Sequence, residues 1–513
     1  MPDSHSQKPQ DAVFAFLSDP AAHGGAEVTR IDTHGAAVFL AGDRVLKVKR
    51  AVKFPFLDYS TLEKRKAACE AELQVNRLFA PDIYRGVVPI VKDKGGRLSL
   101  GGEGEVVEWA LEMRRFDENA TLDRLADQGR FDLALADDLA RVVAAAHAAA
   151  PAVEAEAWLD ALARFIQQND SALRKCPDFF DAAEINTLTA ASSGALDRLR
   201  PMLTLRGAEG LIRRGHGDLH LGNIALIDGR PVPFDAIEFD PLIAAGDVLY
   251  DLAFLLMDLV ERGLNKAANA VLNRYLAETR RDSDLDALAA LPLFMSLRAA
   301  IRAKVTAARL ENARPEERDA IAKAAQTYFR LACELIAPHP PALLAIGGLS
   351  GTGKSVLARD LAPDVSPAPG AVLLRSDVER KMLFGKTETE RLPTQAYSLE
   401  ANEKVYASLA AKAKRIIAAG HSAIVDAVFA RESERIGIAA SAPAAAFHGL
   451  FLEADLATRR ARIGRRRNDA SDADANVAQQ QEAYDLGPMD WTRIDASGTP
   501  EDTLERVRVA LGP

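Results

Sequence analysis

One stretch of this chain has the residue types and spacing needed to hold phosphate groups. Residues 348–355 read G-L-S-G-T-G-K-S and match the pattern G-x-x-x-x-G-K-[ST] without a gap. Glycines allow a tight loop whose backbone N–H groups point at phosphate oxygens. Lys354 can reach the β- and γ-phosphates of ATP, and the Ser355 hydroxyl can bind Mg²⁺. We therefore expect ATP and Mg²⁺ at this loop, which consists of Gly348, Leu349, Ser350, Gly351, Thr352, Gly353, Lys354 and Ser355.

Carboxylates follow two expected strands beyond this loop. The strand at 371–375 leads to Asp377, and the strand at 422–426 ends on Asp426. Because open α/β sheets bind ligands at the carboxyl ends of their strands, Asp377 could accept the proton of an attacking hydroxyl. Arg380 could hold substrate or phosphate, and Asp426 could contact Mg²⁺ or substrate. The alternative for Asp377 is an ordinary helix N-cap.

Several arginines crowd one expected helix and the loop after it. They are Arg459, Arg462, Arg465, Arg466 and Arg467. Arginines suit a lid that closes over transferring phosphates and offsets their charge. The alternative is a solvated basic face. Among these arginines, Arg462 and Arg466 are our candidates for ATP contacts.

A second set of residues with possible chemistry occurs earlier in the chain. Residues 216–223 read H-G-D-L-H-L-G-N, so that Asp218 and Asn223 are five positions apart, which is the spacing of a kinase catalytic loop. Asp235 follows after one expected hairpin that turns at Asp228 and Gly229. In this arrangement Asp218 would orient and deprotonate an acceptor hydroxyl, and Asn223 and Asp235 would hold Mg²⁺ against the ATP phosphates.

The elements that must position these residues fall into two groups. Residues 1–24 are expected to be disordered or extended, and 25–336 form strands with one helix, followed by a mostly helical part. A proline-rich linker at 337–341 ends the last helix. Residues 342–513 alternate strands and helices, which implies a parallel sheet. The fold class is therefore α+β for the first domain and α/β for the second.

Composition narrows the class of protein. The net charge of −9 gives no broad attraction for nucleic acid or anionic membranes. The three cysteines are far apart, which favours free thiols in a reducing compartment. The amino-terminal sequence has no secretory pattern, and no apolar run is long enough to span a membrane. We therefore expect a cytoplasmic protein with no membrane partner, and the sequence does not indicate an oligomeric state.

Residues 342–513 resemble small P-loop kinases of the zeta-toxin, gluconate-kinase and polynucleotide-kinase type. The shared features are the phosphate loop, Ser376-Asp377 with Arg380, Val425-Asp426-Ala427 and a lid-like stretch at 465–481. The resemblance implies that Asp377 is the base, that Arg380 binds substrate and that a lid arginine contacts ATP. The acceptors of these kinases range from sugars to nucleic-acid ends, so the resemblance indicates a reaction type.

Residues 25–335 resemble the aminoglycoside phosphotransferase and choline-kinase superfamily, which is distantly related to protein kinases. The resemblance rests on residues 216–223 and Asp235. It implies a two-lobed domain with an ATP-binding lysine on a strand and a partner glutamate on the next helix. Lys47 and Glu72 are the first choices for this pair, and Lys49 and Glu70 are alternatives. It also implies an adenine-binding hinge at 108–116 and a structural acid pair, Asp247 and Asp251.

The order of the two parts resembles proteins called bifunctional aminoglycoside phosphotransferase/ATP-binding proteins. This implies an ATP-dependent phosphotransferase with two nucleotide sites, which acts on a hydroxyl of a small metabolite. One alternative is that one domain is a regulatory ATP sensor and only the other is catalytic. A further alternative is phosphorylation of polynucleotide 5′-hydroxyls by the second domain.

Overall fold

The computed structural model describes residues 7–54, 57–443, 445–465 and 470–512. These residues form two compact units. Unit 1 comprises residues 1–164 and 203–258, and unit 2 comprises 165–202 and 259–513. The boundary predicted at 337–341 stays a prediction. Unit 2 contains both the helices before this segment and the sheet after it. No helix in the described part of the chain is both long and apolar enough to cross a membrane.

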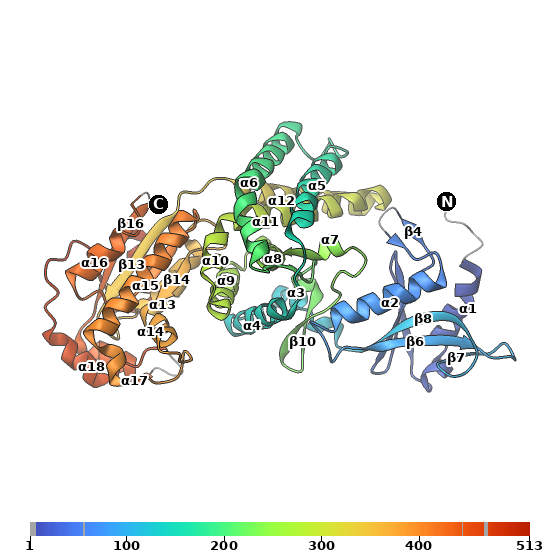
Figure 1. Ribbon diagram of the computed structural model, residues 1–513, viewed down its shortest axis with the longest axis horizontal. Helices are drawn as coiled ribbons and strands as arrows, with labels where there is room; N and C mark the ends of the chain where they lie inside the picture. Colours follow the sequence, from blue (N-terminus) through green and yellow to red (C-terminus); the bar gives the residue numbers. More distant parts are fainter. Residues whose placement is uncertain (1–6, 55–56, 444, 466–469, 513) are drawn as a thin grey trace. The chain divides into compact units, whose positions relative to one another are not determined.

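A six-stranded sheet forms the first part of unit 1, in the order β1-β2-β3-β8-β6-β7. All its pairings are antiparallel. Helix α2 contacts β8 and β6 and lies along this sheet (Figure 1). The bounds are β1 (Val28–Asp32), β2 (Ala36–Ala41), β3 (Arg44–Lys49), α2 (Leu62–Asn76), β6 (Tyr84–Lys92), β7 (Leu98–Leu100) and β8 (Glu105–Arg114), with a small hairpin of β4 (Lys53–Phe54) and β5 (Leu57–Asp58) before α2.

The amino-terminal segment differs from our expectation. Residues 1–24 were expected to be disordered or extended, but helix α1 spans Gln7–Ser18. Val13, Phe14 and Leu17 follow helical spacing and are buried against strands β2, β3 and β8. Burial of this apolar stripe stabilises the helix, and the short length of the stripe explains why the segment reads as polar in the sequence.

The rest of unit 1 holds the loop of residues 216–223. The expected hairpin forms from β10 and β11, and Asp228 and Gly229 have positive φ at its turn, as a tight hairpin requires. The bounds are α3 (Leu122–Asp127), α4 (Leu133–Ala149), α5 (Ala155–Leu173), α6 (Ala182–Ala208), β9 (Ile212–Arg214), β10 (Ile224–Ile227), β11 (Arg230–Pro233), α7 (Pro241–Ala244), β12 (Ala245–Asp247) and α8 (Val248–Glu261), of which α5, α6 and α8 are divided between the two units.

Unit 2 contains a five-stranded parallel sheet in the order β14-β15-β13-β16-β17. Its apolar core includes Ile346, Ile424 and Leu452, all almost fully buried. The strands are β13 (Ala342–Gly348), β14 (Val372–Arg375), β15 (Ala423–Asp426), β16 (Ala446–Glu453) and β17 (Thr492–Asp495), the last of which our sequence analysis did not identify. The helices associated with the sheet are α13 (Lys354–Leu361), α14 (Ser376–Leu383), α15 (Leu399–Ala418), α16 (Glu432–Ala439), α17 (Leu456–Arg465), α18 (Ala475–Gln480) and α19 (Pro500–Leu511).

Helices of unit 2 contact the edge strand β14. Asn273 donates to the Ala371 carbonyl at 3.2 Å and accepts from the Leu373 N–H at 2.6 Å. These bonds satisfy backbone groups that an edge strand would otherwise expose. The helices of this part are α9 (Asn265–Thr279), α10 (Asp282–Asp286), α11 (Leu291–Ala308) and α12 (Pro315–Ile336).

Candidate functional site

Lys47 lies at the centre of an ion-pair cluster in unit 1. Its Nζ lies 2.8 Å from Glu72 Oε1 and 2.8 Å from Asp235 Oδ1. Burial alone would lower the pKa of Lys47, but the carboxylates of Asp235 and Glu72 more than offset this and raise it well above its ordinary value. The lysine is therefore held as a cation beside the predicted metal-binding acid.

The alternative lysine occupies the other side of the same glutamate. Lys49 Nζ lies 2.5 Å from Glu72 Oε2 and 2.5 Å from Glu238 Oε1. Lys47 and Lys49 are two positions apart on β3, so both side chains project from one face of the sheet. Glu70, by contrast, is exposed and lies 3.7 Å from Lys66. The structure thus brings Glu72, and not Glu70, to both lysines.

The loop of residues 216–223 brings Asp218 and Asn223 together. Asn223 Nδ2 donates to Asp218 Oδ2 at 2.9 Å and to the Asp218 carbonyl at 3.1 Å. His220 Nδ1 accepts from the Gly222 N–H at 3.1 Å, which leaves the proton of a neutral ring on Nε2, 3.4 Å from Asp218 Oδ2. The Asp218 carboxylate is part-exposed and can meet a ligand.

Two buried acids lie near this loop, and Asp251 bonds to it directly. Asp251 accepts from the backbone N–H groups of His216 at 2.8 Å and Gly217 at 2.9 Å, and it contacts His147 Nε2 at 3.1 Å. Asp247 forms a buried pair with Arg206, at 2.5 Å and 2.9 Å. Both predicted structural acids therefore accept backbone hydrogen bonds: Asp251 from His216 and Gly217, and Asp247 from Leu249.

The expected adenine hinge at 108–116 is mostly strand. Residues up to Arg114 belong to β8, and Glu108 is fully buried beside Arg65 at 2.9 Å. Glu108 therefore lies within strand β8 and not in the turn that follows this strand. Met113 and Phe116 pack in one apolar cluster with residues of β10 and β11.

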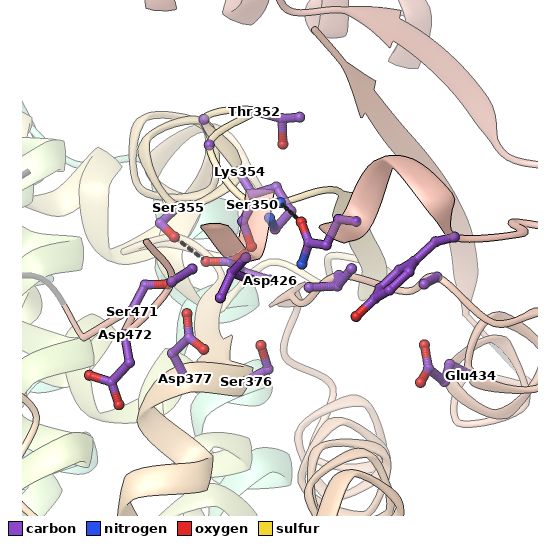
Figure 2. A pocket seen from close by; sticks show the side chains of 18 of the residues that line it. Ser350, Thr352, Lys354, Ser355, Ser376, Asp377, Asp426, Glu434, Ser471 and Asp472 are labelled. Carbon is purple, nitrogen blue, oxygen red and sulfur yellow. Dashed lines mark hydrogen bonds between the residues drawn. The ribbon is translucent and has the colours of Figure 1, made fainter. Parts of the chain in front are cut away.

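The phosphate loop lines a pocket of about 850 Å³ in unit 2. Figure 2 shows Lys354, Ser355, Asp426 and Asp377 facing one region of it, with Glu434 at the far side. The Ser355 hydroxyl donates to Asp426 Oδ2 at 2.5 Å. Two oxygen ligands of the kind that Mg²⁺ prefers thus converge beside Lys354, so these residues fit the expected metal.

Asp377 enters the same pocket from the start of α14. Burial raises its pKa, and the nearby Asp426 carboxylate raises it further, while Lys354 and Arg375 act in the opposite direction. No side-chain capping bond occurs at the start of α14, where Arg375 is the N-cap residue. The helix-cap alternative for Asp377 is therefore not supported by a capping hydrogen bond.

Arg380 is buried at the edge of this pocket, with 6% of its surface exposed. It donates to the Ala396 carbonyl at 2.7 Å, and its guanidinium lies 5.0 Å from the centre of the Tyr397 ring. Among the residues that the structure describes, its Nε has no hydrogen-bond partner. Within the described residues no carboxylate forms an ion pair with Arg380, so a nearly buried positive charge borders the pocket.

The arginines of the expected lid do not share one position relative to the pocket. Arg459 is buried, donates to the Ser350 carbonyl at 3.0 Å and forms an ion pair with Glu482, so it supports the phosphate loop from behind. Arg462 lines the pocket and donates to the Thr352 carbonyl at 3.2 Å. Arg466 lies outside the described residues, as does Arg467.

Three residues in or beside the pocket were not named individually as site residues in the sequence analysis. Arg375 Nη2 lies 3.2 Å from Ser355 Oγ, and its Nε lies 3.5 Å from Asp426 Oδ2. Asp472 accepts from Tyr397 Oη at 2.8 Å and pairs with Lys381 at 3.2 Å. Gln481 accepts from the Ser350 N–H at 2.7 Å. Each had a partial signal: Arg375 ends a strand two positions before Asp377, and Asp472 and Gln481 lie in the lid-like stretch at 465–481.

Two family models match this chain. Residues 38–291 match the phosphotransferase enzyme family, and residues 343–485 match an AAA domain. The chain is therefore a kinase or phosphotransferase enzyme. More particularly, it joins a part that matches the phosphotransferase enzyme family to a part that matches an AAA domain and contains a five-stranded parallel sheet, in the order that the sequence predicted.

Relatives that align over most of this chain occur in mycobacteria. Uncharacterized proteins of Mycobacterium tuberculosis and Mycobacterium bovis are 29% identical over 488 residues, which covers 92% of this chain and 93% of each relative. Among solved structures, a gluconokinase from Sinorhizobium meliloti is 18% identical, with a TM-score of 0.26, over 34% of this chain and 93% of its own. A choline/ethanolamine kinase family protein from Mesorhizobium loti is 13% identical, with a TM-score of 0.37, over 64% and 99%.

Proposed function

We propose that this enzyme has two ATP sites and that each site transfers the γ-phosphoryl group to a hydroxyl of a small, sugar-like or aminoglycoside-like metabolite. The observation that carries the proposal is that each unit places a lysine beside carboxylates suited to metal binding and proton removal. In unit 1 Lys47 contacts Glu72 and Asp235, and in unit 2 Lys354 lines one pocket with Asp377 and Asp426. We expect the protein to act in the cytoplasm, since its three cysteines are free.

In unit 1, Asp218 is the proposed base, because its carboxylate is part-exposed and is oriented by Asn223. Lys47 would bind the ATP phosphates while Glu72 holds its ammonium group in place. Asn223 and Asp235 offer the amide and carboxylate oxygens that would hold Mg²⁺. When bound, the ion would neutralise charge on the phosphates.

In unit 2, Asp377 is the proposed base and Ser355 and Asp426 are the proposed Mg²⁺ ligands. Lys354 and Arg462 would offset charge on the transferring phosphoryl group. The nearly buried charge of Arg380 favours an acceptor that carries an anionic group, because a buried cation is costly without a partner. The acceptor hydroxyl would then lie between Arg380 and the γ-phosphate.

One observation favours a second function for unit 1. The turn between β1 and β2, residues 33–35, contains a single glycine, Gly35, where related kinases use a glycine-rich loop over the phosphates. A weaker hold on the phosphates suits a regulatory ATP sensor. In that case unit 2 alone would transfer phosphate.

Calorimetric titration tests whether two sites bind ATP. With Mg²⁺ present, we expect the intact protein to bind two ATP molecules per chain and the Lys354→Ala variant to bind one, because only the phosphate loop is changed. Lys404→Ala is the control, since Lys404 is an exposed residue paired with Glu400. A stoichiometry of one ATP in the intact protein would contradict the proposal.

A further inference from the structure

The side chain of Asn76 forms a buried clamp between helix α2 and the segment that carries Asp235. Its Oδ1 accepts from the Ala236 N–H at 2.8 Å, and its Nδ2 donates to the Ala236 carbonyl at 3.3 Å. Nδ2 also lies 3.1 Å from the Glu72 carbonyl. Asn76 is fully buried and lies one helical turn after Glu72. The helix that carries Glu72 is therefore bonded on two atoms to the residue that follows Asp235.

Tyr84 holds the same segment from strand β6. Its hydroxyl oxygen accepts from the Asp235 N–H at 3.0 Å, and only 1% of the side chain surface is exposed. Asp235 has a φ of 59°, which is in the left-handed region that non-glycine residues rarely adopt. Such a conformation persists only where the surrounding structure fixes it. Tyr84 bonds to the N–H of Asp235, and Asn76 bonds to the N–H and the carbonyl of Ala236.

We propose that Asn76 and Tyr84 are positioning residues that keep the Lys47–Glu72–Asp235 cluster assembled before nucleotide or metal binds. Displacement of the Asp235–Ala236 segment would leave Asn76 Oδ1 and the backbone N–H of Ala236 buried without their present partners, which is costly in a low-dielectric interior. Lys47 already lies 2.8 Å from both carboxylates. The cluster therefore needs no helix movement to become complete, and less binding free energy is spent on ordering it.

The consequence for MgATP rests on the proposed function of unit 1. Groups that orient metal ligands commonly change metal affinity by about 10- to 100-fold when they are replaced. We expect loss of the clamp to weaken the response of ATP binding to Mg²⁺ much more than it weakens ATP binding without metal. A purely structural role would weaken ATP binding to the same extent with and without Mg²⁺.

The test uses full-length protein carrying Lys354→Ala, so that only unit 1 binds nucleotide. Asn76→Leu removes all the amide bonds at similar size, and Tyr84→Phe removes only the acceptor for the Asp235 N–H. Two quantities are measured: hydrogen exchange of the Asp235 and Ala236 amides without ligand, and ATP affinity as a function of Mg²⁺. Ser296→Ala, which removes a buried 2.7 Å bond to the Ala332 carbonyl in unit 2, is the control for general destabilisation.

We expect exchange of both amides to become faster by about tenfold or more, and the Mg²⁺ concentration for half-maximal ATP binding to rise by about tenfold or more. ATP affinity without Mg²⁺ should change by less than about threefold. Unchanged exchange in folded Tyr84→Phe or Asn76→Leu, or an equal loss of affinity with and without Mg²⁺, would overturn the proposal. If Asn76→Leu does not fold, Tyr84→Phe alone decides between these results.

The failure of this inference is distinguishable from failure of the proposed function. If the Lys354→Ala protein binds no ATP, unit 1 is not a nucleotide site and the proposed function is wrong there. The exchange measurement still reports on the clamp in that case, because it needs no ligand. Slow exchange in the parent and fast exchange in both variants would support the positioning role, and no acceleration would refute it.

Discussion

Lys354→Ala is expected to lower phosphoryl transfer by unit 2 by about 10²–10³-fold, because it removes a preorganised cation from the place where charge develops on the γ-phosphate. In the structure Lys354 Nζ lies 3.2 Å from the Leu349 carbonyl, so the side chain folds back over its own loop. Alanine keeps the helical start of α13, since it is a strong helix former. The measurement is transfer of labelled γ-phosphate from ATP to a mixture of hydroxyl metabolites.

Two comparisons show whether this effect is local. Lys404→Ala changes an exposed lysine of the same unit and should leave transfer unchanged. A variant that combines Lys354→Ala with Asp218→Asn should lose the transfer that remains. Retention of at least half of the original activity by this double variant would show that neither proposed site performs the chemistry.

Asp218→Asn is expected to reduce transfer by unit 1 by about 10²–10⁴-fold, which is the usual contribution of a positioned general base. The replacement has the same shape and can still accept from Asn223, so the loop geometry should persist. ATP affinity should change little, because the proposed phosphate and metal contacts come from Lys47, Asn223 and Asp235. Turnover is measured in the Lys354→Ala background, with ATP binding followed by calorimetry.

Asp228→Asn is the matched control for this variant. Asp228 is an exposed acid at the turn between β10 and β11 and is paired with Arg114 at 2.8 Å. Its replacement should leave turnover intact. If Asp218→Asn keeps full turnover in this background while ATP still binds unit 1, then the assignment of Asp218 as the base of unit 1 is wrong.

Residues that are close in sequence could be assigned from sequence alone. The phosphate loop is one local segment, so its spacing fixes its geometry. The same holds for Asp218 and Asn223, which are joined within one loop. The two-part order of the folds was also predictable, because strand and helix patterns change clearly along the chain.

Residues whose roles depend on distant contacts could not be assigned. Lys47 and Lys49 present the same face of β3, so no local pattern distinguishes them, and the structure shows that Glu72 contacts both. Arg459 has the same sequence surroundings as Arg462, yet it is buried behind the phosphate loop. Asn76 looks like an ordinary helix residue until Ala236 is placed beside it, 160 positions later. These differences arise from tertiary packing, which a single sequence does not record.

The most direct test of the central claim is to incubate the protein with MgATP and a cell metabolite extract and to search by mass spectrometry for products heavier by one phosphoryl group. The intact protein, Lys354→Ala and Asp218→Asn are compared in the same extract. The account predicts at least one new phosphorylated metabolite, which is lost in one of the two variants and thereby identifies the site that makes it. Absence of any phosphorylated product, while ATP binds at both sites, would contradict it.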